Sequence, residues 1–197
     1  MKKYMIIGCL ALSCSFATVV TPFGTESVLA AASKQTVHPT QIKNINEKNI
    51  ISLIVAAQKH YVYTSSGGKG TGKIESFKIK NDPNAQEYRF LSADIGTPKK
   101  LSAYLTQVFT KQASETYIKE RFITYQGRTA QLNADGGNLL QFDKATAKLL
   151  RSSGNVRDYQ LIIPYPADVG MKPEVQIVTV QKEKGVWRIA TPPEKLF

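Results

Sequence analysis

The hydrophobic period changes along this chain, and that change limits the folds open to it. After Asn46, a good N-cap residue, the apolar residues recur every three to four positions, which is the spacing of one helical face. They are Ile50, Ile51, Leu53, Ile54, Ala57 and Tyr61. A second helix is expected from Thr97-Pro98, where threonine caps and proline suits the first turn, and Thr110 is expected to cap a third helix ending near Arg121.

Alternating and β-branched segments dominate the rest of the chain, which indicates strands. We expect strands at 122–125, 128–132, 157–165, 174–183 and 186–190, after an earlier hairpin formed by 73–80 and 87–91. The segment 145–151 is compatible with either a strand or a helix. Val175, Ile177 and Val180 are expected in the core. Together these patterns predict an α+β fold, in which N-terminal helices pack on one face of a curved antiparallel sheet.

The first 32 residues have the form of a secretory signal peptide. Lys2 and Lys3 precede an apolar run, and Val28-Leu29-Ala30 and Ala30-Ala31-Ala32 both offer small residues before a cleavage point. A retained membrane anchor and a lipid attachment at Cys14 are the alternatives, but the run is short for a membrane span and the residues before Cys14 match a lipid-attachment motif poorly. We therefore expect a signal peptide at 1–32, a flexible linker at 33–45 and one domain at 46–197. Because Cys9 and Cys14 both lie in the signal, the exported domain is expected to lack a disulfide and a thiol nucleophile.

The chain is strongly basic, with a formal net charge of +11. Without the proposed signal it keeps a charge of about +10, which favours a polyanionic neighbour such as a teichoic acid or anionic peptidoglycan. Nucleic acid is not expected as a partner, because the chain is predicted to be exported and no nucleic-acid-binding motif is present. The basic residues are scattered, so a merely soluble surface is the alternative interpretation.

The residue types argue against catalysis. The predicted domain and linker hold only His38 and His60, and no G-x-S-x-G motif occurs. The glycine-rich segment 67–72 lacks the G-K-[ST] order of a phosphate-binding loop and is expected to be a turn. Asp135 and Asp143 form the one carboxylate pair considered for a glycosidase, and surface carboxylates are the alternative. The sequence therefore favours a non-enzyme without a cofactor or metal.

Residues 131–142, reading Q-L-N-A-D-G-G-N-L-L-Q-F, form the least ordinary segment of the chain. Asp135-Gly136-Gly137-Asn138 has the composition of a turn in which backbone positions need positive φ. Such loops lie on the surface and often carry function, although a plain connection between strands is the simpler interpretation. The segment Tyr88-Arg89-Phe90 is a weaker candidate, for stacking against sugars or nucleotides.

Three segments resemble the IseA-type inhibitors of bacterial DL-endopeptidases. They read Y-R-F-L-S-A-D-I-G-T-P-K-K-L-S-A-Y-L-T-Q-V-F-T, then A-D-G-G-N-L-L-Q-F-D-K-A-T-A-K-L-L, then V-T-V-Q-K-E-K-G-V-W-R-I. The resemblance covers roughly residues 46–190, and its most specific part is the D-G-G loop with the aromatic residue and Asp-Lys-Ala that follow. It implies a secreted, wall-associated, proteinaceous inhibitor of NlpC-type cysteine peptidases, with two lobes around a cleft. Those peptidases cut the D-glutamyl–diaminopimelate link of peptidoglycan stem peptides.

The resemblance and the residues together suggest a target-binding loop. Its members are Asn133, Asp135, Gly136, Gly137, Asn138, Leu139 and Leu140. Asp135 would imitate a stem-peptide carboxylate, the glycines would allow close backbone approach, and the two leucines would supply an apolar anchor. The inhibitor is expected to act as a monomer and non-covalently. The alternatives are an exported ligand-binding or enzymatic α+β domain of conical shape, and a cationic wall-binding module.

Overall fold

The computed structural model describes residues 38–70, 75–80, 86–133 and 137–197. Several expected features lie outside the described residues. They are the proposed signal peptide with its cleavage region, residues 71–72 of the glycine-rich segment, the turn expected at 81–84, and the loop residues Asp135 and Gly136. In the part that is described, no helix is both long and apolar enough to cross a membrane.

The first helix, α1 (Asn49–Ser65), begins three residues after Asn46, the residue expected to cap it. The side-chain Oδ1 of Asn46 accepts hydrogen bonds from the backbone N of Lys48 at 2.9 Å and of Asn49 at 3.0 Å. These bonds satisfy amide groups that have no partner inside the helix. The expected apolar stripe faces the core, and its buried members are Ile50, Leu53, Ile54, Ala57, Tyr61 and Thr64.

Two shorter helices, α2 (Pro98–Leu105) and α3 (Lys111–Arg121), follow as predicted. Thr97 Oγ1 accepts from the backbone N of Lys100 at 3.3 Å, and Thr110 Oγ1 accepts from that of Ala113 at 3.2 Å. Each threonine therefore caps the helix that it was expected to start. In the described part of the chain, four short 3-10 helices complete the helical elements, namely η1 (Pro39–Gln41), η2 (Phe142–Lys144), η3 (Ala167–Val169) and η4 (Pro193–Lys195).

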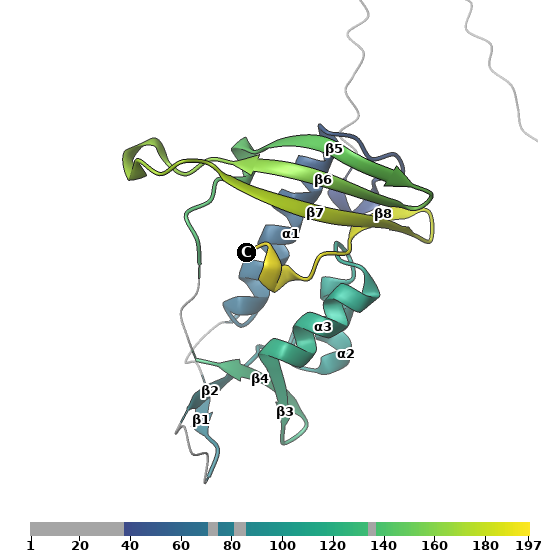
Figure 1. The fold of residues 1–197 in the computed structure, drawn as a ribbon. Helices are drawn as coiled ribbons and strands as arrows, with labels where there is room; N and C mark the ends of the chain where they lie inside the picture. Colours follow the sequence, from purple (N-terminus) through teal and green to yellow (C-terminus); the bar gives the residue numbers. More distant parts are fainter. Residues whose placement is uncertain (1–37, 71–74, 81–85, 134–136) are drawn as a thin grey trace, which may run out of the picture. The chain divides into compact units, whose positions relative to one another are not determined.

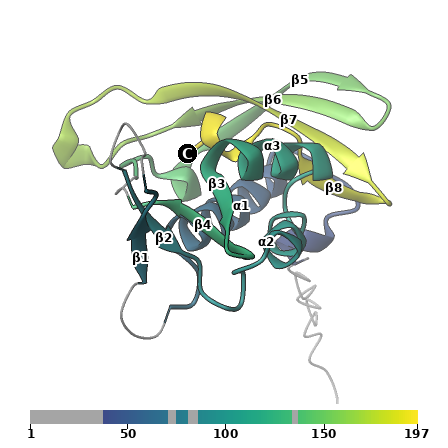
Figure 2. The same cartoon turned by 90° about the horizontal axis from the view of Figure 1, so that it is seen from below.

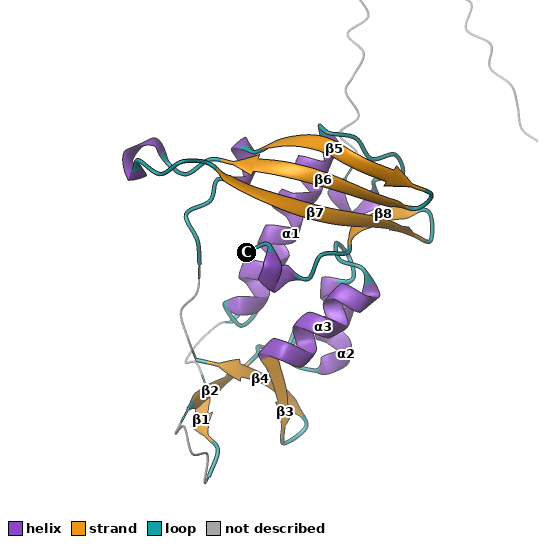
Figure 3. Ribbon diagram, in the orientation of Figure 1, coloured by secondary structure: helices purple, strands orange, loops and turns teal. Residues whose placement is uncertain are grey.

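Over the described residues the strands form two antiparallel four-stranded sheets, where the sequence predicted a curved antiparallel sheet (Figures 1 and 3). The first sheet has the order β1-β2-β4-β3 and contains β1 (Ser76–Lys78), β2 (Glu87–Phe90), β3 (Phe122–Tyr125) and β4 (Arg128–Leu132). The second has the order β5-β6-β7-β8 and contains β5 (Thr146–Ser153), β6 (Val156–Ile163), β7 (Glu174–Glu183) and β8 (Val186–Ile189). The α+β class is confirmed, and the ambiguous segment 145–151 is a strand.

The expected core set in β7 is wrong for two of its three members. Val180 is fully buried, but the side chains of Val175 and Ile177 are 56% and 60% exposed. Successive strand residues point to opposite faces, so odd-numbered and even-numbered positions of an unbroken strand cannot share one core. The inward positions are Val178 and Val180, and both have 0% exposure.

The segment expected to be a linker, 33–45, packs on the domain over its described part. The side chains of Ile42 and Ile45 are buried in the main core, and Ile42 O accepts a hydrogen bond from Trp187 N in β8 at 2.9 Å. Burial of two isoleucines stabilises an ordered position for this stretch, by about 1.5–3 kcal/mol per side chain. The packed chain therefore begins earlier than residue 46.

Helix α1 is joined to both sheets, which sets the position of the candidate loop. Along its length α1 contacts β5 and β8 of the second sheet. At its last residue, Ser65 O accepts from the side-chain Nε2 of Gln131 in β4 at 2.7 Å. Figure 2 shows α1 and α3 in front of the strands β5–β8, with β4 beside the end of α1. The loop that follows β4 therefore leaves the first sheet close to the C-terminal end of α1.

Candidate functional site

The loop suggested by the sequence leaves β4 through a firmly bonded residue. Asn133 N donates to Glu87 O in β2 at 2.8 Å, and Asn133 Nδ2 donates to the Glu87 carboxylate at 3.0 Å. The other carboxylate oxygen of Glu87 accepts from Ser76 Oγ at 2.6 Å. The hydrogen bond from Ser76, and then that from Asn133, holds the pKa of Glu87 below its ordinary value. The first stem of the loop is thus attached to three strands.

The second stem is held by the backbone and by one buried side chain. Asn138 Oδ1 accepts from Leu140 N at 3.1 Å, and Gln141 N donates to Pro164 O, just after β6, at 2.8 Å. The local Asn138 bond is of the type that stabilises turns. The loop therefore connects the end of β4, a central strand of the first sheet, to the end of β6 in the second sheet.

The two leucines of the loop have different environments. Leu139 is 61% exposed, whereas Leu140 is 7% exposed and belongs to the main hydrophobic core. Gly137 is also exposed, and a β-carbon built there would meet no atom within 4 Å. A partner can therefore reach Gly137 and Leu139 directly, while Leu140 anchors the loop from inside.

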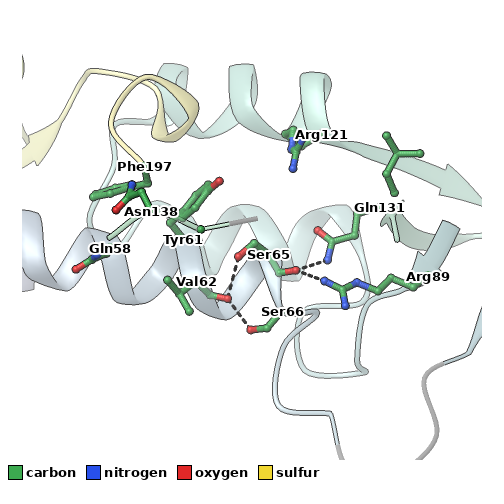
Figure 4. Close-up of a pocket in the computed structure, with 12 residues that line it drawn as sticks. Gln58, Tyr61, Val62, Ser65, Ser66, Arg89, Arg121, Gln131, Asn138 and Phe197 are labelled. Atoms are coloured by element: carbon green, nitrogen blue, oxygen red, sulfur yellow. Dashed lines mark hydrogen bonds between the residues drawn. The ribbon is translucent and has the colours of Figure 1, made fainter. Parts of the chain in front are cut away.

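A cavity of about 240 Å³ adjoins the second stem (Figure 4). The loop contributes Gly137 and Asn138 to its wall. The polar part of the remaining wall comes from α1, β2, β4 and α3, and consists of Gln58, Ser65, Ser66, Arg89, Gln131 and Arg121. The apolar part consists of Tyr61, Val62, Leu132 and Phe197. The cavity is thus a polar site with an apolar floor, next to the segment singled out by sequence.

The cationic side chains of the cavity are oriented by bonds to the protein. Arg89 Nη2 and Gln131 Nε2 both donate to Ser65 O, the last carbonyl of α1, as the dashed lines of Figure 4 show. The partial negative charge of a helix C-terminus favours a cation at that place. Arg121 reaches the cavity from α3, and its Nε lies 2.8 Å from Glu194 Oε1. The sequence did not predict that Arg89 and Arg121 line one cavity.

The aromatic residues beside Arg89 face away from this cavity. Phe77 stacks on Phe90 and Tyr125, with ring centroids 4.5 Å and 4.4 Å apart, and the guanidinium of Arg128 lies 3.9 Å from the centre of the Phe90 ring. Strand alternation separates Tyr88 and Phe90 from Arg89. These rings pack on one another, which is an ordinary way to cover a small sheet.

The two histidines meet in a different groove of about 600 Å³. His38 and His60 line it together with Ser52, Tyr104 and Asp143. His60 Nδ1 lies 2.8 Å from Ala56 O, its ring stacks on Tyr104 at 4.4 Å, and its Nε2 lies 3.5 Å from Gln107 Oε1. Among the described residues, no hydrogen bond joins His60 to Ser52 or to Asp143, so the relay of a serine hydrolase is not formed here.

The described residues do not show the carboxylate pair that the sequence offered for a glycosidase, Asp135 and Asp143. Asp143 lies in the histidine groove, and its possible partner Asp135 is outside the described residues. Elsewhere in the described part of the chain, no group of three or more His, Cys, Asp or Glu side chains is placed to hold a metal ion.

Comparison with known proteins gives two matches. A family model described as "IseA DL-endopeptidase inhibitor" matches residues 41–193, which is most of the chain. A protein of Bacillus subtilis (strain 168), named "Uncharacterized protein YoeB", is 31% identical over 152 residues, covering 74% of this chain and 81% of that protein.

Proposed function

The chain belongs to the IseA DL-endopeptidase inhibitor family, and we propose that it is a secreted inhibitor of NlpC-type cysteine DL-endopeptidases. It restrains cell-wall autolysis by placing the loop of residues 133–140 in the catalytic groove of the peptidase. The observation that supports this use of the loop is its construction: both stems are hydrogen-bonded to the sheets, and Gly137 and Leu139 are exposed between them.

Anchored stems favour binding because they lower its entropic cost. A free loop loses conformational freedom when a groove immobilises it, by about 0.5–1.5 kcal/mol for each mobile side chain. Here Asn133 is held by Glu87, and Leu140 is held by the core, before any partner arrives. The exposed apolar surface of Leu139 supplies contact area, and the neighbouring glycines permit close backbone approach.

The carboxylate of Asp135 is the proposed recognition group. A groove that accepts an acidic stem peptide must present positive potential or hydrogen-bond donors, and a carboxylate on a glycine-rich loop can occupy the same position as the substrate's acid. The chain after residue 32 contains no cysteine. Inhibition is therefore proposed to be non-covalent, reversible and competitive with peptidoglycan.

The test is the digestion of peptidoglycan by a purified NlpC-type DL-endopeptidase, with protein from Ala32 onward added in increasing amounts. Asp135→Ala is expected to raise the inhibition constant about tenfold or more, equivalent to about 1.4 kcal/mol or more. Asp143→Ala removes the same charge from an exposed position in η2 and is the matched control. It should inhibit like the wild type.

The kinetics and the matched variants test two parts of the proposed mechanism. Competitive inhibition must ease as the peptidoglycan concentration rises. Inhibition that is lost equally in Asp135→Ala and Asp143→Ala would remove Asp135 from the mechanism. Absence of inhibition across several such peptidases would refute the proposed function.

The net charge of +11 supports a second part of the proposal, retention at the wall. Scattered basic residues bind a polyanion through electrostatic attraction, which dissolved salt screens. The Debye length falls from about 10 Å at 0.1 M salt to about 3 Å at 1 M, so the attraction weakens as salt is added. The protein should therefore elute from purified walls as salt is raised. Retention that is indifferent to salt would show that the charge only keeps the surface soluble.

A further inference from the structure

The cavity behind the loop has positive charge that the protein only partly compensates. Among the described residues, Arg121 is paired with Glu194, while Arg89 forms no ion pair and donates to the carbonyl of Ser65. Neither arginine is paired with the terminal carboxylate of Phe197 within the same part of the chain. Two arginines therefore line this space, Arg121 beside the carboxylate of Glu194 and Arg89 beside the carbonyl of Ser65.

A neutral donor and an apolar floor complete the site. Asn138 uses its Oδ1 to accept from Leu140 N, which leaves its amide Nδ2 as a donor, whereas the hydroxyl groups of Ser65 and Ser66 already donate to Val62 O. Tyr61, Val62 and Leu132 line the same space with apolar surface. The volume, about 240 Å³, equals that of about eight water molecules at ~30 Å³ each. This is enough for a carboxylate and a few methylene groups.

We propose that this cavity binds a carboxylate carried on a short aliphatic stem, of the glutamate or glutarate type. The guanidinium groups recognise the carboxylate through charge-assisted hydrogen bonds, and the stem covers the apolar floor. Because Gly137 and Asn138 belong to both the cavity wall and the loop, an occupant contacts the loop from behind. The proposal goes beyond inhibition of a peptidase, and its main test requires no peptidase.

The test is a titration of the whole exported chain with glutarate, followed by two-dimensional NMR of amide groups. Saturable shifts are expected for the backbone amides of Gly137 and Asn138 and for the side-chain amide of Gln131. Glutaramide has the same stem without charge and is the matched ligand control. It should produce none of these shifts at the same concentrations.

Two double variants test the cavity without changing the net charge. Arg121→Gln with Glu194→Gln removes the ion pair at the cavity, and is expected to weaken glutarate binding about tenfold or more. Arg151→Gln with Asp158→Asn removes an ion pair of 2.7 Å in the second sheet, and should bind glutarate like the wild type. Arg89→Lys keeps the charge but loses the fork of donors, so its binding should also weaken.

The proposal is overturned if glutarate shifts none of the cavity resonances, if glutaramide acts like glutarate, or if both double variants weaken binding equally. A competition arm identifies the natural source of the carboxylate. Glutarate that relieves inhibition of a DL-endopeptidase would indicate an acidic side chain of the enzyme as the occupant. Glutarate that binds without affecting inhibition would indicate a free acidic peptide. Either result supports the carboxylate site.

Discussion

Leu139 and Leu140 are neighbours in the sequence, and replacing each by alanine is expected to damage a different property of the protein. Leu140 is 7% exposed and lies in the main core, so its truncation leaves a cavity. Such changes lower the free energy of unfolding by about 2–5 kcal/mol. For a domain of this size, 1 kcal/mol shifts the melting temperature by about 2–4 °C, so Leu140→Ala should lower it by roughly 4–20 °C.

Leu139 is 61% exposed, so its truncation should change the free energy of unfolding by no more than about 0.5 kcal/mol. Its effect should appear in binding. Full burial of a leucine side chain contributes about 1.5–3 kcal/mol, and the exposed part of Leu139 therefore offers about 1–2 kcal/mol to a partner. Leu139→Ala should raise the inhibition constant about 5- to 30-fold.

The assay combines thermal unfolding of both variants with peptidase inhibition measured well below their melting temperatures. Under those conditions Leu140→Ala remains folded, and it should weaken inhibition only through the lost anchoring of the loop, by less than Leu139→Ala does. The reasoning is refuted if Leu139→Ala melts as early as Leu140→Ala. The proposed contact of Leu139 with the peptidase is refuted if Leu139→Ala inhibits as strongly as the wild type while Asp135→Ala inhibits less strongly.

Two further predictions concern the first stem of the loop and the second sheet. Hydrogen bonds from Ser76 and Asn133 depress the pKa of Glu87 in the folded protein. The ionised, hydrogen-bonded carboxylate is therefore fully present above the ordinary glutamate pKa of about 4.3. It is lost as the pH falls through the lower pKa of the folded state. The side-chain amide resonance of Asn133 should report that midpoint, and a midpoint above the ordinary value would contradict the assignment. In β7, Ile177→Ser should leave the melting temperature nearly unchanged, whereas Val178→Ser should lower it clearly. Equal effects of the two variants in thermal unfolding would contradict the observed inward and outward facing of these side chains.

Local signals in the sequence were reliable where short-range physics decides the structure. Asn46, Thr97 and Thr110 start the three helices because a side-chain oxygen three residues or fewer away is enough to satisfy free amide groups. The bounds of β3, β4 and β7 also agree with the predicted segments. The error at Val175 and Ile177 arose because hydrophobicity was given more weight than strict alternation.

The sequence alone determined the α+β class, the starts of α2 and α3, most strand segments and the family, because each depends on local periodicity or on motifs that are contiguous in the chain. Only the tertiary structure separated the strands into two sheets, since pairing depends on which distant edges meet. It also placed Leu140 in the core and Leu139 outside, although the two residues are chemically identical. The cavity formed by Arg89, Arg121 and Asn138 likewise follows from packing of α3, β2 and the loop around the end of α1, and no sequence spacing encodes that meeting.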